Sequence, residues 1–159
     1  MHCADRCTAN CHLDLTGTIP SVFGELTNLQ VLDFDFNFLH GTIPPQLGNL
    51  LDMRRLYFYG NQFTGPIPAS IGNLTKLLEL DMGGIDLGGT IPTQLGQLVH
   101  LETLYVDAND LLTGAIPSEL GNLASIEVFW MHDNHLSSTL PVTLGKLTTV
   151  KVSTENVTK

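Results

Sequence analysis

The chain has 159 residues, of which 43% are apolar and 14% are charged. This composition excludes intrinsic disorder and provides one domain with a hydrophobic core. Sixteen acidic against seven basic side chains give a formal net charge of −9, so we expect no nucleic-acid partner, because phosphate backbones would be repelled. No apolar run approaches the roughly 18 residues that span a bilayer, which predicts no membrane segment in this chain.

The first twelve residues contain all three cysteines, Cys3, Cys7 and Cys11, flanked by His2 and His12. Three thiolates and an imidazole would suit zinc, but their spacing does not match the usual zinc motifs. The favoured interpretation is one disulfide pair with one thiol left over, and free thiols are the third alternative. We therefore predict no metal site and no cofactor.

From residue 13 onward, one pattern returns along the chain at a nearly constant step. An apolar residue precedes proline at Ile19-Pro20, Ile43-Pro44, Ile67-Pro68, Ile91-Pro92, Ile116-Pro117 and Leu140-Pro141. The steps are 24, 24, 24, 25 and 24 residues, and the extra residue lies most simply in Asp110-Leu111-Leu112. A fixed period of this length predicts a solenoid.

Each unit begins with a short strand. In the segment 31–35, Leu32 and Phe34 point one way and the residues between them point the other, since side chains alternate along a strand. Stacked coils would form a parallel sheet, each coil burying its leucines against its neighbours. This alternation predicts that Leu56, Leu80, Leu104 and Phe129 are buried and that Tyr57, Asp81, Tyr105 and Trp130 are exposed.

An asparagine follows the strand at Asn37, Asn61, Asn109 and Asn134, where its amide would satisfy backbone groups of adjacent coils. Ile85 takes this place in the third unit, among four glycines, so we expect the most irregular coil there. The following Gly-x-Ile-Pro reads as an extended segment. The next residues, Pro-x-x-Leu-Gly, are too short for a long helix and predict a turn or a 3₁₀ helix.

The unit resembles the plant-type leucine-rich repeat, L-x-x-L-x-x-L-x-L-x-x-N-x-L-x-G-x-I-P-x-x-L-G-x, from roughly Leu13 to Val152. The resemblance implies an α/β leucine-rich-repeat solenoid: a curved coil with a parallel β-sheet on its concave face and short 3₁₀ or irregular segments on its convex side. It also implies a recognition role similar to that of receptor-like kinases, receptor-like proteins and polygalacturonase-inhibiting proteins, in signalling or defence.

The resemblance further implies a cysteine-paired cap before the first repeat, of which residues 1–12 would be a remnant. Residues 13–152 would be the repeat array, and residues 153–159 a degenerate C-terminal tail. Residues 1–6 contain no apolar signal region. We expect a fragment, a truncated gene model or a short relative of a larger secreted or membrane-anchored protein, extracellular or at the cell surface if a signal peptide precedes it.

The candidate ligand site is the concave face, on which adding the period to one strand gives three columns of side chains. The candidate residues in these columns are Asp33, Asp35, Arg55, Tyr57, Tyr59, Glu79, Asp81, Tyr105, Asp107, Trp130 and His132. Strands lie about 4.8 Å apart, so Tyr105 should lie beside Trp130, and Asp107 beside His132. Tyrosine and tryptophan are enriched at interface hot spots. The alternative is that these aromatic rings only shield the sheet or pack on each other.

We therefore expect non-catalytic recognition of a protein, a peptide or a cell-wall oligosaccharide. Catalysis is disfavoured, because the acidic pairs lie on an open face without a nucleophile or a pocket. Asn73 and Asn156 lie in glycosylation sequons, although Asn73 also has a place in the repeat frame. The rival function is structural or ice-binding, through a flat face bearing Thr18, Thr42, Pro66, Thr90, Ala115 and Thr139.

Overall fold

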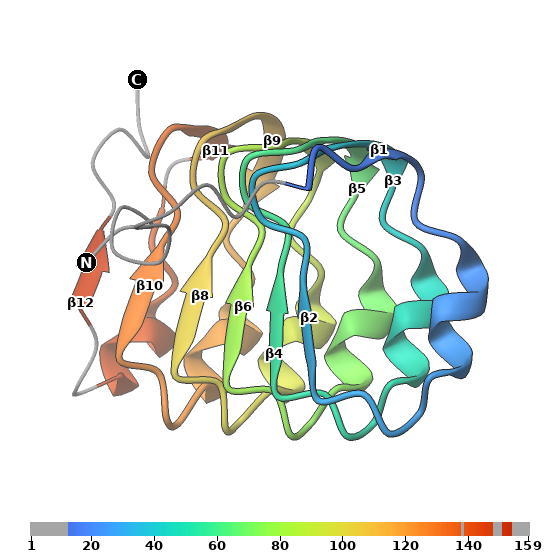
Figure 1. Cartoon of the computed structure of the whole chain (residues 1–159). Coiled ribbons are helices and arrows are strands. Elements are labelled where there is room, and N and C mark those ends of the chain that lie inside the picture. The colour runs from blue at the N-terminus through green and yellow to red at the C-terminus, as the bar shows by residue number, and fades with distance from the viewer. Residues whose placement is uncertain (1–12, 138, 148–150, 154–159) are drawn as a thin grey trace.

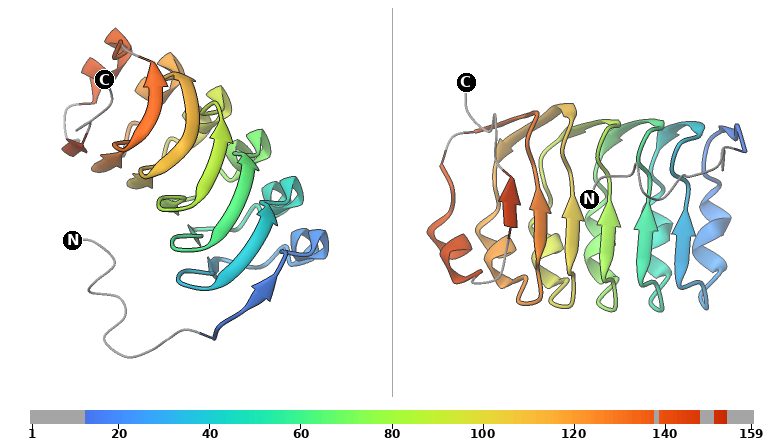
Figure 2. Two further views of the ribbon diagram at one scale, coloured as in Figure 1. Left: turned by 90° about the horizontal axis from the view of Figure 1, so that it is seen from above. Right: turned by 60° about the vertical axis from the view of Figure 1, so that its left-hand side comes forward.

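The computed structural model describes residues 13–137, 139–147 and 151–153. The chain winds into a curved stack of coils, with one row of strands on the concave side and short helices on the opposite side (Figures 1 and 2). The described residues contain 3₁₀ helices and no α-helix, and all described strand pairs are parallel. The predicted leucine-rich-repeat solenoid is confirmed.

Each full coil contributes one strand to each of two sheets. The concave sheet has the order β12-β10-β8-β6-β4-β2. Its strands are β2 (Val31–Asp33), β4 (Arg55–Tyr57), β6 (Glu79–Asp81), β8 (Thr103–Tyr105), β10 (Val128–Trp130) and β12 (Lys151–Ser153). The second sheet contains β1 (Thr16–Gly17), β3 (Phe38–Thr42), β5 (Gln62–Pro66), β7 (Asp86–Gly89), β9 (Asn109–Ala115) and β11 (Asn134–Ser137).

The convex side carries one five-residue 3₁₀ helix per coil: η2 (Ser21–Glu25), η3 (Pro45–Asn49), η4 (Ala69–Asn73), η5 (Thr93–Gln97), η6 (Ser118–Asn122) and η7 (Val142–Lys146). The proline before each helix is extended, as at Pro68 with φ −65° and ψ 124°. A glycine in each helix allows the coils to approach closely. A Cβ added to Gly48 would lie 2.4 Å from the backbone oxygen of Ser70 in the next coil, a distance that only glycine permits.

The core lies between the two sheets and the helices. Leu56, Leu80, Leu104 and Phe129 are fully buried, so the predicted register of the concave sheet is confirmed. Two residues further along each strand, the inward positions hold the buried side chains Phe58, Met82, Val106 and Met131. Full burial of such a side chain contributes about 1.5–3 kcal/mol. Each coil obtains this burial from its neighbours, which is the basis of solenoid stability.

The asparagines form the predicted ladder between coils. Asn61 accepts a hydrogen bond from the backbone nitrogen of Leu39 (3.0 Å) and donates to the carbonyls of Phe34 (2.8 Å) and Phe58 (3.0 Å). Ile85 takes no part in the ladder, because its apolar side chain is buried in the core.

The expectation that this third coil is the most irregular is wrong. The register instead shifts in the next coil, between β9 and β11: Asn134 pairs with Asn109, but His135 pairs with Thr113. The extra residue of the 25-residue step is absorbed here as a bulge, in the segment that the repeat count indicates. Leu111, in this bulge, is exposed to solvent.

Candidate ligand-binding face

The concave sheet aligns the three predicted columns through its register. Val31 pairs with Arg55, Arg55 with Glu79, and Glu79 with Thr103, always at a step of 24 residues. The second column runs in the same way through Asp33, Tyr57, Asp81, Tyr105 and Trp130. The third column follows where the chain leaves the strands and contains Asp35, Tyr59, Gly83, Asp107 and His132.

Both predicted neighbour pairs are present. The rings of Tyr105 and Trp130 meet edge to face, with centroids 5.1 Å apart and an interplanar angle of 70°. The ring of His132 lies 5.8 Å from that of Trp130, and its Nε2 lies 3.8 Å from Oδ2 of Asp107. Three aromatic rings from β8 and from the end of β10 therefore form one cluster.

The predicted exposure is wrong for part of this face. Tyr57 is only 5% exposed and Asp81 only 4%. Tyr105 and Trp130 are partly exposed. Asp81 lies between Tyr57 and Tyr105 in the sheet register, and the hydroxyl of Tyr57 donates a hydrogen bond to Oε2 of Glu79 (2.5 Å). Alternation thus gives the face on which a side chain lies, whereas neighbouring side chains decide how much of it solvent reaches.

Several carboxylates of the face are held by the backbone. Oδ1 of Asp33 accepts from the nitrogen of Asp35 (3.0 Å), and Oδ1 of Asp81 accepts from the nitrogen of Gly83 (3.0 Å). Oδ1 of Asp35 accepts from the nitrogen of Tyr59 in the next coil (2.8 Å). Such contacts satisfy backbone donors where the strand ends. These aspartates therefore stabilise the turns as well as charging the face.

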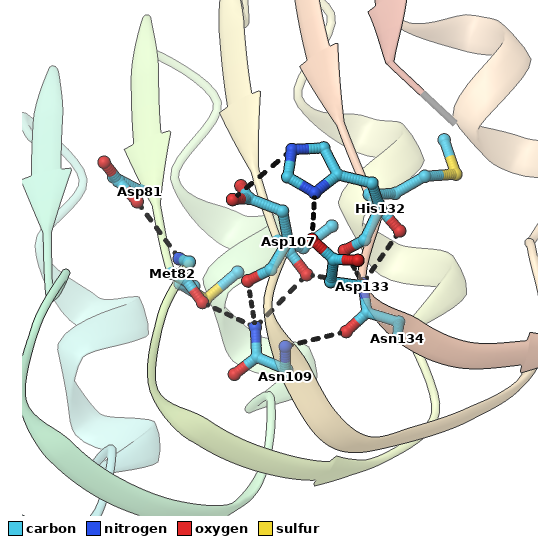
Figure 3. Close-up of polar contacts among 10 residues, drawn as sticks. Asp81, Met82, Asp107, Asn109, His132, Asp133 and Asn134 are labelled. Carbon is cyan, nitrogen blue, oxygen red and sulfur yellow. Dashed lines mark hydrogen bonds and ion pairs between the residues drawn. The ribbon is translucent and has the colours of Figure 1, made fainter. Parts of the chain in front are cut away.

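Two residues at the rim escaped the sequence analysis. Asp133 holds His132 through a contact of 2.9 Å between Oδ2 and Nδ1, so His132 lies between Asp107 and Asp133 (Figure 3). Phe36 packs edge to face on Tyr59, with centroids 5.2 Å apart. Both follow the third column by one residue, and adding the period to that position would have found them.

The remaining predicted residues are distributed differently. Arg55 and Asp33 are exposed on the first two strands of the concave sheet, and Glu79 is partly exposed. Asn73 is exposed at the end of η4 on the convex side. The three cysteines, Cys3, Cys7 and Cys11, and the sequon at Asn156 lie outside the described residues.

Neither metal nor membrane chemistry is indicated by the described part of the chain. It contains no group of three or more His, Cys, Asp or Glu side chains arranged to hold a metal ion. Among these same residues, no helix has the length and hydrophobicity to cross a bilayer.

Comparison with known proteins places the chain in a family. The model of the leucine-rich repeat region matches residues 15–157, so the chain belongs to the leucine-rich-repeat proteins. The comparison with curated proteins gives no match.

Solved structures of plant proteins share the fold. The ectodomain of the Arabidopsis thaliana receptor kinase GASSHO1/SCHENGEN3, solved with CASPARIAN STRIP INTEGRITY FACTOR 2, is 35% identical, with a TM-score of 0.86 over 89% of this chain and 17% of that one. A plant ice-binding protein is 34% identical, with a TM-score of 0.83 over 89% and 46%. The Arabidopsis receptor kinase HAESA, solved with the peptide hormone IDA and the co-receptor SERK1, is 33% identical, with a TM-score of 0.81 over 89% and 24%. The chain thus spans less than half the length of each.

Proposed function

We propose that this chain recognises an extended peptide on its concave sheet and has no catalytic role. The observation that carries the proposal is the cluster of Tyr105, Trp130 and His132, whose rings remain partly accessible on an ordered sheet face. Rigid amphipathic rings in a partly desolvated setting are typical hot spots of protein interfaces.

Two further facts support a peptide. The receptor kinases GASSHO1/SCHENGEN3 and HAESA share the fold over 89% of this chain, and HAESA was solved with a peptide hormone. The five strands β2 to β10 span about 19 Å across the sheet at the usual spacing. An extended peptide rises about 3.3 Å per residue, so about six residues would cross the face.

The test uses a random twelve-residue peptide library displayed on phage, panned against the whole chain. Peptides that bind are synthesised and titrated by calorimetry against the parent chain and two variants. Trp130→Ala should weaken binding by at least about 2 kcal/mol, or about 30-fold in Kd, as hot-spot truncation does. Thr75→Ala, which changes an exposed residue just after η4 on the convex side, should have almost no effect.

Two results would contradict the proposal. No enrichment over a panning control on uncoated wells would remove the peptide ligand, and binding of neutral cell-wall oligosaccharides in its place would replace it. Equal affinities of the parent chain and a folded Trp130→Ala variant would move the site off this part of the concave face. Circular dichroism of the variant establishes that it is folded.

A second candidate function is ice binding, favoured by the plant ice-binding protein among the similar structures. Thr18, Thr42, Thr90 and Thr139 of the predicted array are exposed, as are Pro66 and Ala115. The neighbours differ from those that the period suggests, because strands of the second sheet pair at a step of 22 residues, as His40 does with Gln62. Thr42 therefore lies beside Thr64.

The ice-binding candidate has a direct assay. Thermal hysteresis and ice recrystallisation are measured for the parent chain and for Thr42→Tyr with Thr64→Tyr, which would break the flat face. Loss of activity in the double variant supports this face as the ice-binding surface. Absence of both activities in the parent chain rejects the candidate.

A further inference from the structure

The aromatic corner, defined as Tyr105, Trp130 and His132, lies in a part of the concave face with a one-sided charge. The second and third columns carry Asp33, Asp35, Asp81 and Asp107, and their sequence contains no lysine or arginine. The cations of the columns, Arg55 and Lys151, are both in the first column. Arg55 is three strands away from β10, or about 14 Å at the usual strand spacing.

Carboxylates surround the corner on the sides that the structure describes. Asp107 and Asp133 contact the two ring nitrogens of His132, at 3.8 Å and 2.9 Å, and Asp81 is the register partner of Tyr105. Asp107 is 4% exposed, whereas 51% of the Asp133 side chain is exposed. A partly buried carboxylate acts through a lower effective dielectric than water provides, so its attraction for a cation is screened less.

We propose that the aromatic corner binds an arginine or lysine side chain of the peptide ligand, so that this inference rests on the proposed function. The cation would lie on the indole of Trp130, which is the best cation–π partner among aromatic side chains. The carboxylates of Asp107 and Asp133 supply the opposite charge. Arginine fits better than lysine, because its planar guanidinium stacks on a ring and can also donate to a carboxylate.

A neutral or acidic occupant fits this surface less well. An acidic side chain would meet several carboxylates of like charge, which costs binding energy and suppresses the wrong partner. A neutral sugar ring could stack on Trp130 but would gain nothing from the charge. The four aspartates of two adjacent columns are thus the feature that separates a basic peptide from the other ligand classes.

The experiment uses the peptides selected from the same random library. Binders should carry an arginine or lysine at a fixed position, and replacing that arginine by citrulline, its neutral isostere, should raise the Kd at least tenfold. With Asp133→Asn or Asp107→Asn in the chain, the same replacement should raise the Kd less than threefold, because the charged partner is gone. Asp133→Asn protects the test from a folding defect, since its side chain is half exposed.

Asp52→Asn is the matched control, because Asp52 is an aspartate paired with Lys76 outside the concave columns. In this variant the full citrulline effect should persist. If no peptide is enriched, the proposed function fails and this inference fails with it. If peptides bind in a Trp130-dependent way but lack a basic residue, or tolerate citrulline, the inference fails while the proposed function stands.

Discussion

Replacement of Asn109 by leucine should test how strongly the asparagine ladder holds the coils together. Asn109 is fully buried, and its Oδ1 accepts from the backbone nitrogen of Leu87 (3.1 Å). Its Nδ2 donates to the carbonyls of Met82 (2.9 Å), Val106 (3.1 Å) and Asp107 (3.0 Å). One side chain therefore serves four backbone groups in two coils (Figure 3).

The magnitude follows from the groups that lose their partner. The carbonyl of Val106 keeps a second donor, Nδ2 of Asn134 (2.9 Å). The carbonyl of Met82 has no such second amide, because Ile85 stands where its own coil would supply one. Leaving the nitrogen of Leu87 and the carbonyl of Met82 unpaired costs about 1–3 kcal/mol each. A buried leucine returns about 1–2 kcal/mol, so the net loss should be about 1–4 kcal/mol.

Urea unfolding measures this loss, with far-UV circular dichroism and the fluorescence of the single tryptophan as two probes. Asn122→Leu is the control, since Asn122 is exposed at the end of η6 and should change the free energy of unfolding by less than about 0.5 kcal/mol. Equal stability of Asn109→Leu and the parent chain would refute the reasoning. It would mean that the coils need no ladder and that Ile85 is as good an occupant as asparagine.

Three further changes have definite signs. Ala108 has a left-handed φ of 52°, so Ala108→Gly should raise the free energy of unfolding by about 0.5–1 kcal/mol. Gly84→Ala should lower it, because φ is 60° and the new Cβ would lie 2.8 Å from the Tyr59 ring; thermal unfolding checks both, and a shift of the same sign would contradict them. The hydrogen bond and the charge of Lys76 lower the pKa of Asp52. Lys76→Gln should raise that pKa in an NMR titration, and the stabilisation by the pair, present at neutral pH, should disappear as the pH falls through the folded-state pKa of Asp52.

The repeat made the scaffold predictable from sequence. A proline every 24 residues and the alternation around Leu32 predict the coil, the strand and the direction of each side chain. Since parallel coils of equal length align equivalent residues, Tyr105 lies beside Trp130 and Asp107 beside His132, as expected. The extra residue of the longer unit is located by the same count and is found as the bulge between β9 and β11.

Exposure and second-sheet pairing are beyond the reach of the repeat. The period places Tyr57 on the concave face, but its burial depends on side chains in adjacent columns, including Glu79, to which its hydroxyl donates. The stagger of the second sheet, where Thr42 pairs with Thr64, depends on the path of the chain between the strands. Identical spacing in the sequence is compatible with either pairing, so the threonine array could be predicted as exposed but not in its lateral order.

The aspartates of the concave face separate what the fold requires from what a ligand would read. Asp35 accepts a hydrogen bond from Tyr59, and Asp81 accepts one from Gly83, each through one oxygen. An asparagine oxygen can accept the same bond at such a turn, so these contacts require an acceptor and not a negative charge. The charge nevertheless recurs at four positions of two columns, where like charges in neighbouring strands oppose folding. A repulsion that the fold does not need is compensated if a basic ligand occupies the face, and an Asp-to-Asn change removes the charge while it keeps the acceptor.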